Sequence, residues 1–170
     1  MKRKMTAIHE AGHSIIAHYS GLKVKRVFIN EKGGRTETDD INNAKVNKCV
    51  AFIYIAISGI MAQTLYYGSS ILYPDILKGN VDIDRLKEIN LPKIWTKENL
   101  KNSMTGLQGF LSKPYIFGQI DGLADLIIDE SKELKDVNMA IMRITRERTP
   151  EHDAGDLIKL LTNEIFGGRN

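Results

Sequence analysis

The chain has 170 residues, of which 42% are hydrophobic and 26% charged, so its composition is that of a globular domain and excludes a disordered or fibrous protein. The formal net charge is only +3 and no basic stripe is present, which argues against a nucleic-acid-binding module. The single cysteine, Cys49, excludes an intramolecular disulfide and a cysteine-rich structural zinc cluster, so any metal must be held by nitrogen and oxygen atoms.

The length predicts a single domain spanning residues 1–170. The longest nearly apolar run, Cys49–Ala62, is shorter than the roughly 18 to 20 residues that a membrane-spanning helix needs. The basic start leads directly to Glu10 and two histidines, without the apolar segment of a secretory signal peptide. We therefore expect a cytoplasmic protein with no membrane span and no nucleic-acid partner.

The beginning of the chain is predicted to form a helix and a small sheet. Apolar residues recur at helical spacing over residues 4–20, and Gly21 follows as a helix terminator. Leu22–Ile29 is predicted to be a strand, because apolar and charged residues alternate at its start and β-branched and aromatic residues are frequent in it. The Gly33-Gly34 pair is typical of a turn, after which Arg35–Thr38 would form the second strand.

The rest of the chain is predicted to be helical. Apolar residues repeat in steps of three and four from about Asn43 to Tyr67 and also cover the other faces, so this helix should be buried nearly all round. A loop with Pro74 and Gly79 precedes a short helix over Asn80–Ile89. Further helical segments are expected near residues 97–111, 115–135, 137–147 and 154–166. The predicted fold class is mainly α with a small β-sheet, that is, α+β.

The first predicted helix contains the sequence His9-Glu10-Ala11-Gly12-His13, an H-E-x-x-H pattern that this composition makes rare by chance. At about 100° per residue, His9 and His13 lie about 40° apart on the helix surface, one turn from each other, as two ligands of one zinc ion require. Glu10 is close enough to reach a water on that metal and is placed to act as a base. Because a helical glycine costs about 1 kcal/mol relative to alanine, Gly12 indicates that another element packs closely there.

A catalytic zinc site needs a third protein ligand and one open position. His18 lies about 140° further round the helix than His13, so we expect it to be a helix-end or surface histidine. Glu31 falls in a strand-to-turn segment, which is a poor fit to a ligand on a second helix. Asp82 lies near the start of a short predicted helix, where an aspartate is often only a cap that accepts backbone N–H bonds. These residues alone leave the third ligand open.

The segment Thr6–Ala17 resembles the first helix of the FtsH-type zinc metalloproteases. In that family a strand pair follows, then a long helix with a Gly-Gly-Arg-x-Ala-Glu-like segment, then a loop and an aspartate at the start of the next helix. The corresponding stretches here are Leu22–Thr38, Ser58–Gln63 and Gly79–Asp84. The resemblance covers roughly residues 4 to 90. It implies a zincin-like helical metalloprotease domain in which Asp82 completes the zinc site.

The alternatives for the third ligand are Asp84, which lies about 200° round the same helix, then Asp75, Glu88 or no protein residue. The chain also departs from the family's pattern, because Ile60 and Gln63 replace its arginine and glutamate, so the resemblance does not imply the contacts that those charges make. No G-x-x-x-x-G-K-[ST] phosphate-binding loop is present, and the metal-binding pattern begins near the start of the chain. We therefore expect the peptidase part alone, without an ATPase domain or membrane anchor.

The strand after the two glycines is the candidate substrate-binding element. By the resemblance, its residues Arg35, Thr36, Glu37 and Thr38 would form an edge that aligns an extended substrate by main-chain pairing. The alternative interpretation is an ordinary hairpin strand.

The predicted function is a zinc-dependent endopeptidase that hydrolyses peptide bonds in unfolded or flexible polypeptides by a metal-activated water, without its own ATPase. Zn²⁺ is the expected cofactor, held by His9, His13 and Asp82, and Glu10 is the catalytic residue. Residues 1–95 would form the zinc-site portion and residues 96–170 a helical portion. Two other functions stay open: a non-catalytic regulatory or binding module that keeps the protease fold, and a peptidase subunit that docks on a separate ATPase. Because the family's proteases assemble as rings, a homo-oligomer is a further candidate.

Overall fold

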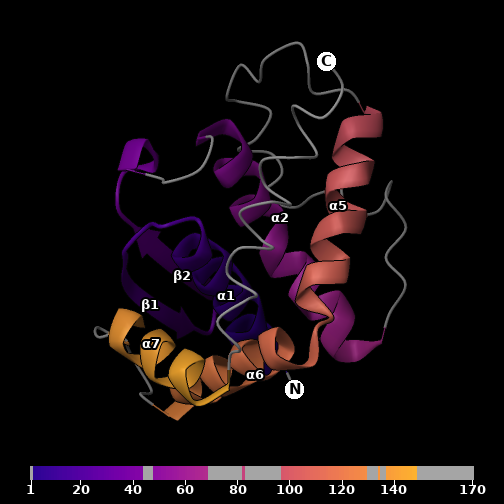
Figure 1. The fold of residues 1–170 in the computed structure, drawn as a ribbon. Helices are drawn as coiled ribbons and strands as arrows, with labels where there is room; N and C mark the ends of the chain where they lie inside the picture. Colours follow the sequence, from indigo (N-terminus) through magenta and orange to yellow (C-terminus); the bar gives the residue numbers. More distant parts are fainter. Residues whose placement is uncertain are drawn as a thin grey trace.

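In the computed structural model (Figure 1), the residues described are 2–43, 48–68, 82, 97–129, 134 and 137–148. They form a mainly helical α+β arrangement with one two-stranded antiparallel sheet. The elements in chain order are α1 (Lys2–Tyr19), β1 (Val24–Asn30), β2 (Gly33–Thr38), the short 3₁₀ helix η1 (Ile41–Asn43), α2 (Lys48–Tyr67), α5 (Lys97–Leu111), α6 (Pro114–Asp129) and α7 (Val137–Arg148). No helix in this part of the chain is long and apolar enough to cross a membrane.

Helix α1 is the centre of the fold, because α2, α6 and both strands pack against it. All of its residues from Glu10 to Ala17 are buried. The two long helices are in close contact at Gly12, where a Cβ atom would lie 2.7 Å from the carbonyl oxygen of Ser58 and 2.9 Å from the Cβ of Ala62. The predicted close contact at Gly12 is therefore confirmed, and α2 is the element that makes it.

The end of α1 explains why the first strand begins later than predicted. Gly21 has a φ of 82°, the left-handed conformation in which glycine commonly ends a helix. Its N–H donates to the carbonyl of His18 at 2.9 Å, and the N–H of Leu22 donates to the carbonyl of Ala17 at 3.0 Å. Because these bonds use Leu22 in the helix cap, β1 starts at Val24.

The two strands are joined at Glu31 and Lys32, so the prediction of a turn at Gly33 and Gly34 is wrong. The side chain of Asn30 explains the difference. Its Oδ1 accepts hydrogen bonds from the N–H groups of Lys32 at 2.8 Å and Gly33 at 3.1 Å, which closes the turn before the glycines are reached. Both glycines therefore lie in β2.

Within the described residues, helix α2 spans Lys48–Tyr67, and Asn43, the predicted start of this helix, instead ends the 3₁₀ helix η1. From Ala51 to Tyr66 every side chain of α2 is buried or half-buried. The prediction of a helix buried nearly all round is confirmed over this range. Its apolar residues face α1 on one side and α5 on another.

The predicted helix over residues 97–111 is confirmed as α5, and the one over 137–147 agrees with α7 to within one residue. The helix predicted over 115–135 is too long, since α6 ends at Asp129. Leu134 instead exchanges both main-chain hydrogen bonds with Val27 of β1, at 2.8 and 3.1 Å, and is buried there. The segment 154–166, the loop with Pro74 and Gly79, and the Asn80–Ile89 helix apart from Asp82 lie outside the described residues.

Candidate metal centre and the cavity beside it

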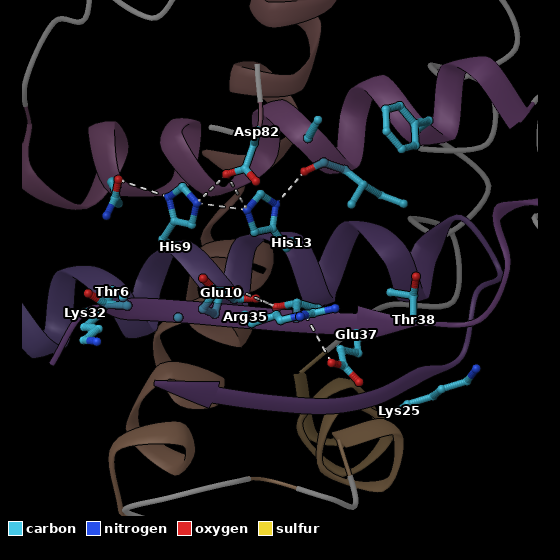
Figure 2. Close-up of a pocket in the computed structure, with 17 residues that line it drawn as sticks. Thr6, His9, Glu10, His13, Lys25, Lys32, Arg35, Glu37, Thr38 and Asp82 are labelled. Atoms are coloured by element: carbon cyan, nitrogen blue, oxygen red, sulfur yellow. Dashed lines mark hydrogen bonds and ion pairs between the residues drawn. The ribbon is translucent and has the colours of Figure 1, made fainter. Parts of the chain in front are cut away.

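His9 and His13 project from the side of α1 that faces α2, and the carboxylate of Asp82 points at both rings (Figure 2). The Nε2 atoms of the two histidines are 2.9 Å apart. Asp82 Oδ2 lies 3.1 Å from Nε2 of His9 and 3.4 Å from Nε2 of His13. Ligand atoms about 2.0 Å from a tetrahedral zinc ion are about 3.3 Å from each other, so this triangle has the size of one face of a zinc coordination sphere. Among the residues that the structure describes, it is the only group of this kind.

The other ring nitrogens determine which imidazole atoms are available to a metal. Nδ1 of His13 lies 2.6 Å from the carbonyl oxygen of Ile55, and Nδ1 of His9 lies 3.2 Å from Oε1 of Gln63. The amide nitrogen of Gln63 donates to the carbonyl of Met5 at 2.9 Å, which fixes its oxygen toward His9. Because both acceptors are oxygens, each Nδ1 carries a proton and donates it, and each Nε2 is left for the metal.

The charges of the site favour an ionised carboxylate beside the imidazoles. Burial opposes the charge on Asp82, but its hydrogen bonds to His13 and His9 hold the pKa of this carboxyl well below its usual range. Burial likewise opposes a charge on His13, whereas the hydrogen bond to Asp82 and the negative charges of Glu10 and Asp82 raise its pKa overall. An ionised carboxylate can ligate a cation directly, and a bound cation would displace the proton of His13.

Gly59 allows α2 to pass directly over the two imidazoles. A Cβ atom at this position would lie 2.6 Å from Nε2 of His13 and 2.7 Å from Nε2 of His9. Any side chain here would occupy the space between the ligand atoms. This contact was not predicted from the sequence, although a glycine inside a helix is the same signal that predicts the close contact at Gly12.

Glu10 extends from the same helix toward the hairpin, so α1 lies between α2 and β2 in Figure 2. Its side chain is almost fully buried, and its Oε2 accepts a hydrogen bond from the hydroxyl of Thr36 at 2.8 Å. A Cβ atom on Gly34 would lie 2.6 Å from Oε1 of Glu10. The carboxylate is therefore held against β2 by one polar contact and one close backbone approach.

A cavity of about 900 Å³ brings these groups together. It is lined by His9, Glu10, His13, Asp82 and Gln63, by the whole of β2, and by apolar residues of α2, including Phe52 and Ile55. The candidate ligands and the candidate base therefore open on one space, although they lie on different sides of α1.

All four candidate substrate-binding residues line this cavity, but their side chains have different partners. Thr36 turns inward to Glu10. Glu37 accepts two hydrogen bonds from Arg26, at 2.6 and 2.9 Å. It also forms an ion pair with Arg35 at 3.1 Å. These hydrogen bonds and the neighbouring arginine charges lower the pKa of Glu37. The hydroxyl of Thr38 donates to the carbonyl of Asp39.

The edge of β2 that does not pair with β1 lies along the cavity. The N–H of Val27 in β1 donates to the carbonyl of Leu134, and the carbonyl of Val27 accepts from the N–H of Leu134, so Val27 forms no ladder bonds with its partner Thr36. In an antiparallel pair, a residue opposite such a position also points its N–H and C=O away from its neighbour. The main-chain groups of Thr36 therefore point away from β1, and within the described part of the chain no strand lies beside this edge.

The remaining candidates are placed away from the triangle or outside the described residues. His18 is half-buried at the end of α1, stacks edge-on against Tyr19, and has its pKa lowered by burial. Glu31 is exposed at the hairpin turn. Asp75, Asp84 and Glu88, the alternative ligands, lie outside the described residues.

Comparisons with known proteins give no match: no family model, no curated protein and no solved structure matches the chain.

Proposed function

We propose that the chain is a zinc-dependent endopeptidase with a zincin-like site of the FtsH type, acting on unfolded or flexible polypeptides. The observation that carries the proposal is that His9, His13 and Asp82 turn their ligand atoms to one point beside the cavity on which Glu10 opens. A metal site and a buried carboxylate on one H-E-x-x-H helix are the parts that metal-assisted hydrolysis needs.

The donor set fits zinc. Two imidazole nitrogens and one carboxylate oxygen are accepted by zinc in hydrolytic enzymes, and three protein ligands are typical of catalytic rather than structural zinc. His9, His13 and Asp82 would hold the ion, with Gln63 and the carbonyl of Ile55 orienting the two rings. When bound, zinc would act as a Lewis acid that polarises a peptide carbonyl and lowers the pKa of a bound water toward about 7.

Glu10 is the residue that moves the proton. Its Oε2 already accepts the hydroxyl proton of Thr36, so Oε1 is the oxygen left to take a proton from the attacking water. The same carboxyl group then returns this proton to the amine nitrogen that leaves the cleaved peptide.

The edge of β2 would position the substrate. An extended peptide that pairs with the main chain of Thr36 lies along the cavity, past Glu10 and the two histidines. Only a segment without secondary structure of its own can pair in this way. This is why the proposed substrates are unfolded or flexible polypeptides.

The test is cleavage of a permanently unfolded protein by the purified chain. We expect fragments to appear, a chelator to stop their formation and added zinc to restore it. Zinc binding without cleavage would replace the proposal with a non-catalytic binding module. Cleavage that depends on an added ATPase and ATP would instead identify a peptidase subunit of a larger machine.

Zinc stoichiometry tests the third ligand. We expect Asp82→Ala to hold much less zinc than the parent chain. Asp125→Ala is the matched control, because this carboxylate forms an ion pair with Lys4 on the surface and does not line the cavity. Equal zinc contents in the parent and in Asp82→Ala would place the third ligand elsewhere.

A further inference from the structure

The side chain of Thr36 serves the base rather than the substrate, and this inference rests on the proposed function. We propose that Thr36 is a positioning residue that fixes the carboxylate of Glu10 through the hydrogen bond from its hydroxyl to Oε2. The main chain of Thr36 faces the open edge of β2, whereas its side chain turns inward onto α1. One residue of the strand therefore connects the substrate edge to the base.

The hydroxyl proton of Thr36 has one preferred acceptor. Its Oγ1 lies 2.8 Å from Oε2 of Glu10, 3.2 Å from the carbonyl oxygen of Glu10 and 3.5 Å from the hydroxyl of Ser14. The carbonyl oxygen already accepts the Ser14 hydroxyl at 2.8 Å. The carboxylate is the nearer and the charged acceptor, so it takes the single proton of Thr36.

This contact fixes the orientation of the Glu10 carboxylate against β2. Glu10 is only 4% exposed, and in the described part of the chain Thr36 is the donor that the structure gives to its carboxylate. Gly34, two residues before Thr36 and on the same face of β2, leaves room for the carboxylate to lie against the strand. With Oε2 fixed in this way, Oε1 keeps one orientation relative to the cavity.

A general base must lie within hydrogen-bonding distance of the proton it takes, so a loss of orientation lowers the rate of the chemical step and not the affinity for substrate. Thr36→Val keeps the shape of the side chain and removes the hydroxyl. We expect it to lower kcat about 10- to 100-fold, the effect of losing one hydrogen bond to a charged group, with KM and zinc content unchanged. Thr36→Ser keeps the hydroxyl and should remain within about threefold of the parent.

A double-mutant comparison distinguishes positioning from substrate contact. In a Glu10→Gln background, Thr36→Val should have no further effect on the single-turnover rate, because the group that Thr36 positions is gone. Thr105→Val is the control, since this hydroxyl lies on the exposed face of α5 and donates to the carbonyl of Lys101. It should cleave at the rate of the parent.

Each outcome bears on the inference. Parental kcat in Thr36→Val, a raised KM with unchanged kcat, or a loss that persists in the Glu10→Gln background would overturn it while leaving the proposed function intact. A parent chain that cleaves no peptide would overturn both. If Thr36→Val does not fold, as a thermal melt would show, Thr36→Ala and Thr36→Ser replace it: cleavage by serine but not by alanine supports the role of the hydroxyl, and equal rates contradict it.

Discussion

The two sides of helix α1 are built differently. The side that faces α2 is closely packed, with Gly12 and Gly59 allowing the helices to approach until α2 lies against the imidazoles. The side that faces the hairpin is polar, and there Glu10 is held by a hydroxyl and a backbone contact on a strand with an open edge.

Under the proposed function, this difference assigns a separate task to each side of α1. Metal ligands must keep fixed distances to one another, and helix packing without intervening side chains provides this rigidity. A base and a substrate must meet in a space that a peptide can enter, and an unpaired strand edge provides it. Variants on the α2 side should therefore change metal affinity, and variants on the hairpin side should change the rate.

The largest expected effect is on the hairpin side. Glu10→Gln should lose about 10²- to 10⁴-fold in cleavage rate, the usual contribution of a general base, while binding the same amount of zinc. Steady-state kinetics and metal analysis of one preparation measure both. Glu31→Gln, at the exposed hairpin turn, serves as the control. If Glu10→Gln lost its zinc as well, the two sides of α1 would not be separable.

On the α2 side the largest effect is expected from Gly59→Ala. The added methyl group would occupy the space next to both Nε2 atoms, so zinc affinity should fall about 5- to 150-fold, as a clash costing about 1 to 3 kcal/mol implies. Competition with a chromophoric chelator measures this. Gly109→Ala on α5 is the matched control, because a Cβ there meets nothing within 4 Å. Equal affinities in the two variants would contradict the role of Gly59.

A smaller loss is expected when the His9 ring loses its acceptor. Gln63→Leu removes the oxygen that receives the Nδ1 proton and should weaken zinc binding about tenfold. Gln63→Glu keeps an oxygen acceptor and should bind zinc more tightly than Gln63→Leu. Gln108→Leu, on the exposed face of α5, controls for the change in polarity. The assignment fails if Gln63→Leu retains parental affinity in the same chelator assay.

The smallest effect concerns the stability of the metal-free protein. Folding raises the pKa of His13 above its ordinary value of 6.5, so its contribution is fully present below pH 6.5 and is lost as the pH rises through the raised pKa. Folding lowers the pKa of Asp82 below 3.8, so its contribution is present above pH 3.8 and is lost as the pH falls through the lowered pKa. Urea unfolding should show this stabilisation between about pH 4 and 6.5, and His13→Gln should remove its decline at higher pH.

The sequence was most informative where local geometry decides the outcome. The helix over residues 97–111 follows from its periodicity, and the end of α1 follows from Gly21. The turn at Glu31 and Lys32 was missed because the Asn30 side chain, not the pair of glycines, closes it. The prediction of a helix that continues to residue 135 was wrong because Leu134 pairs with β1, a contact that no local sequence pattern indicates.

For the site, the sequence alone determined that His9 and His13 share one face of a helix and that Glu10 points about 60° to 100° round the helix from them, because the helical repeat fixes these directions within one turn. Only the tertiary structure decided what faces them. Asp82 meets His9 across 73 positions of the chain, Gln63 across 54, and Thr36 meets Glu10 across 26. Such contacts depend on how α2 and the hairpin pack on α1, and packing is a property of the whole fold rather than of any one segment.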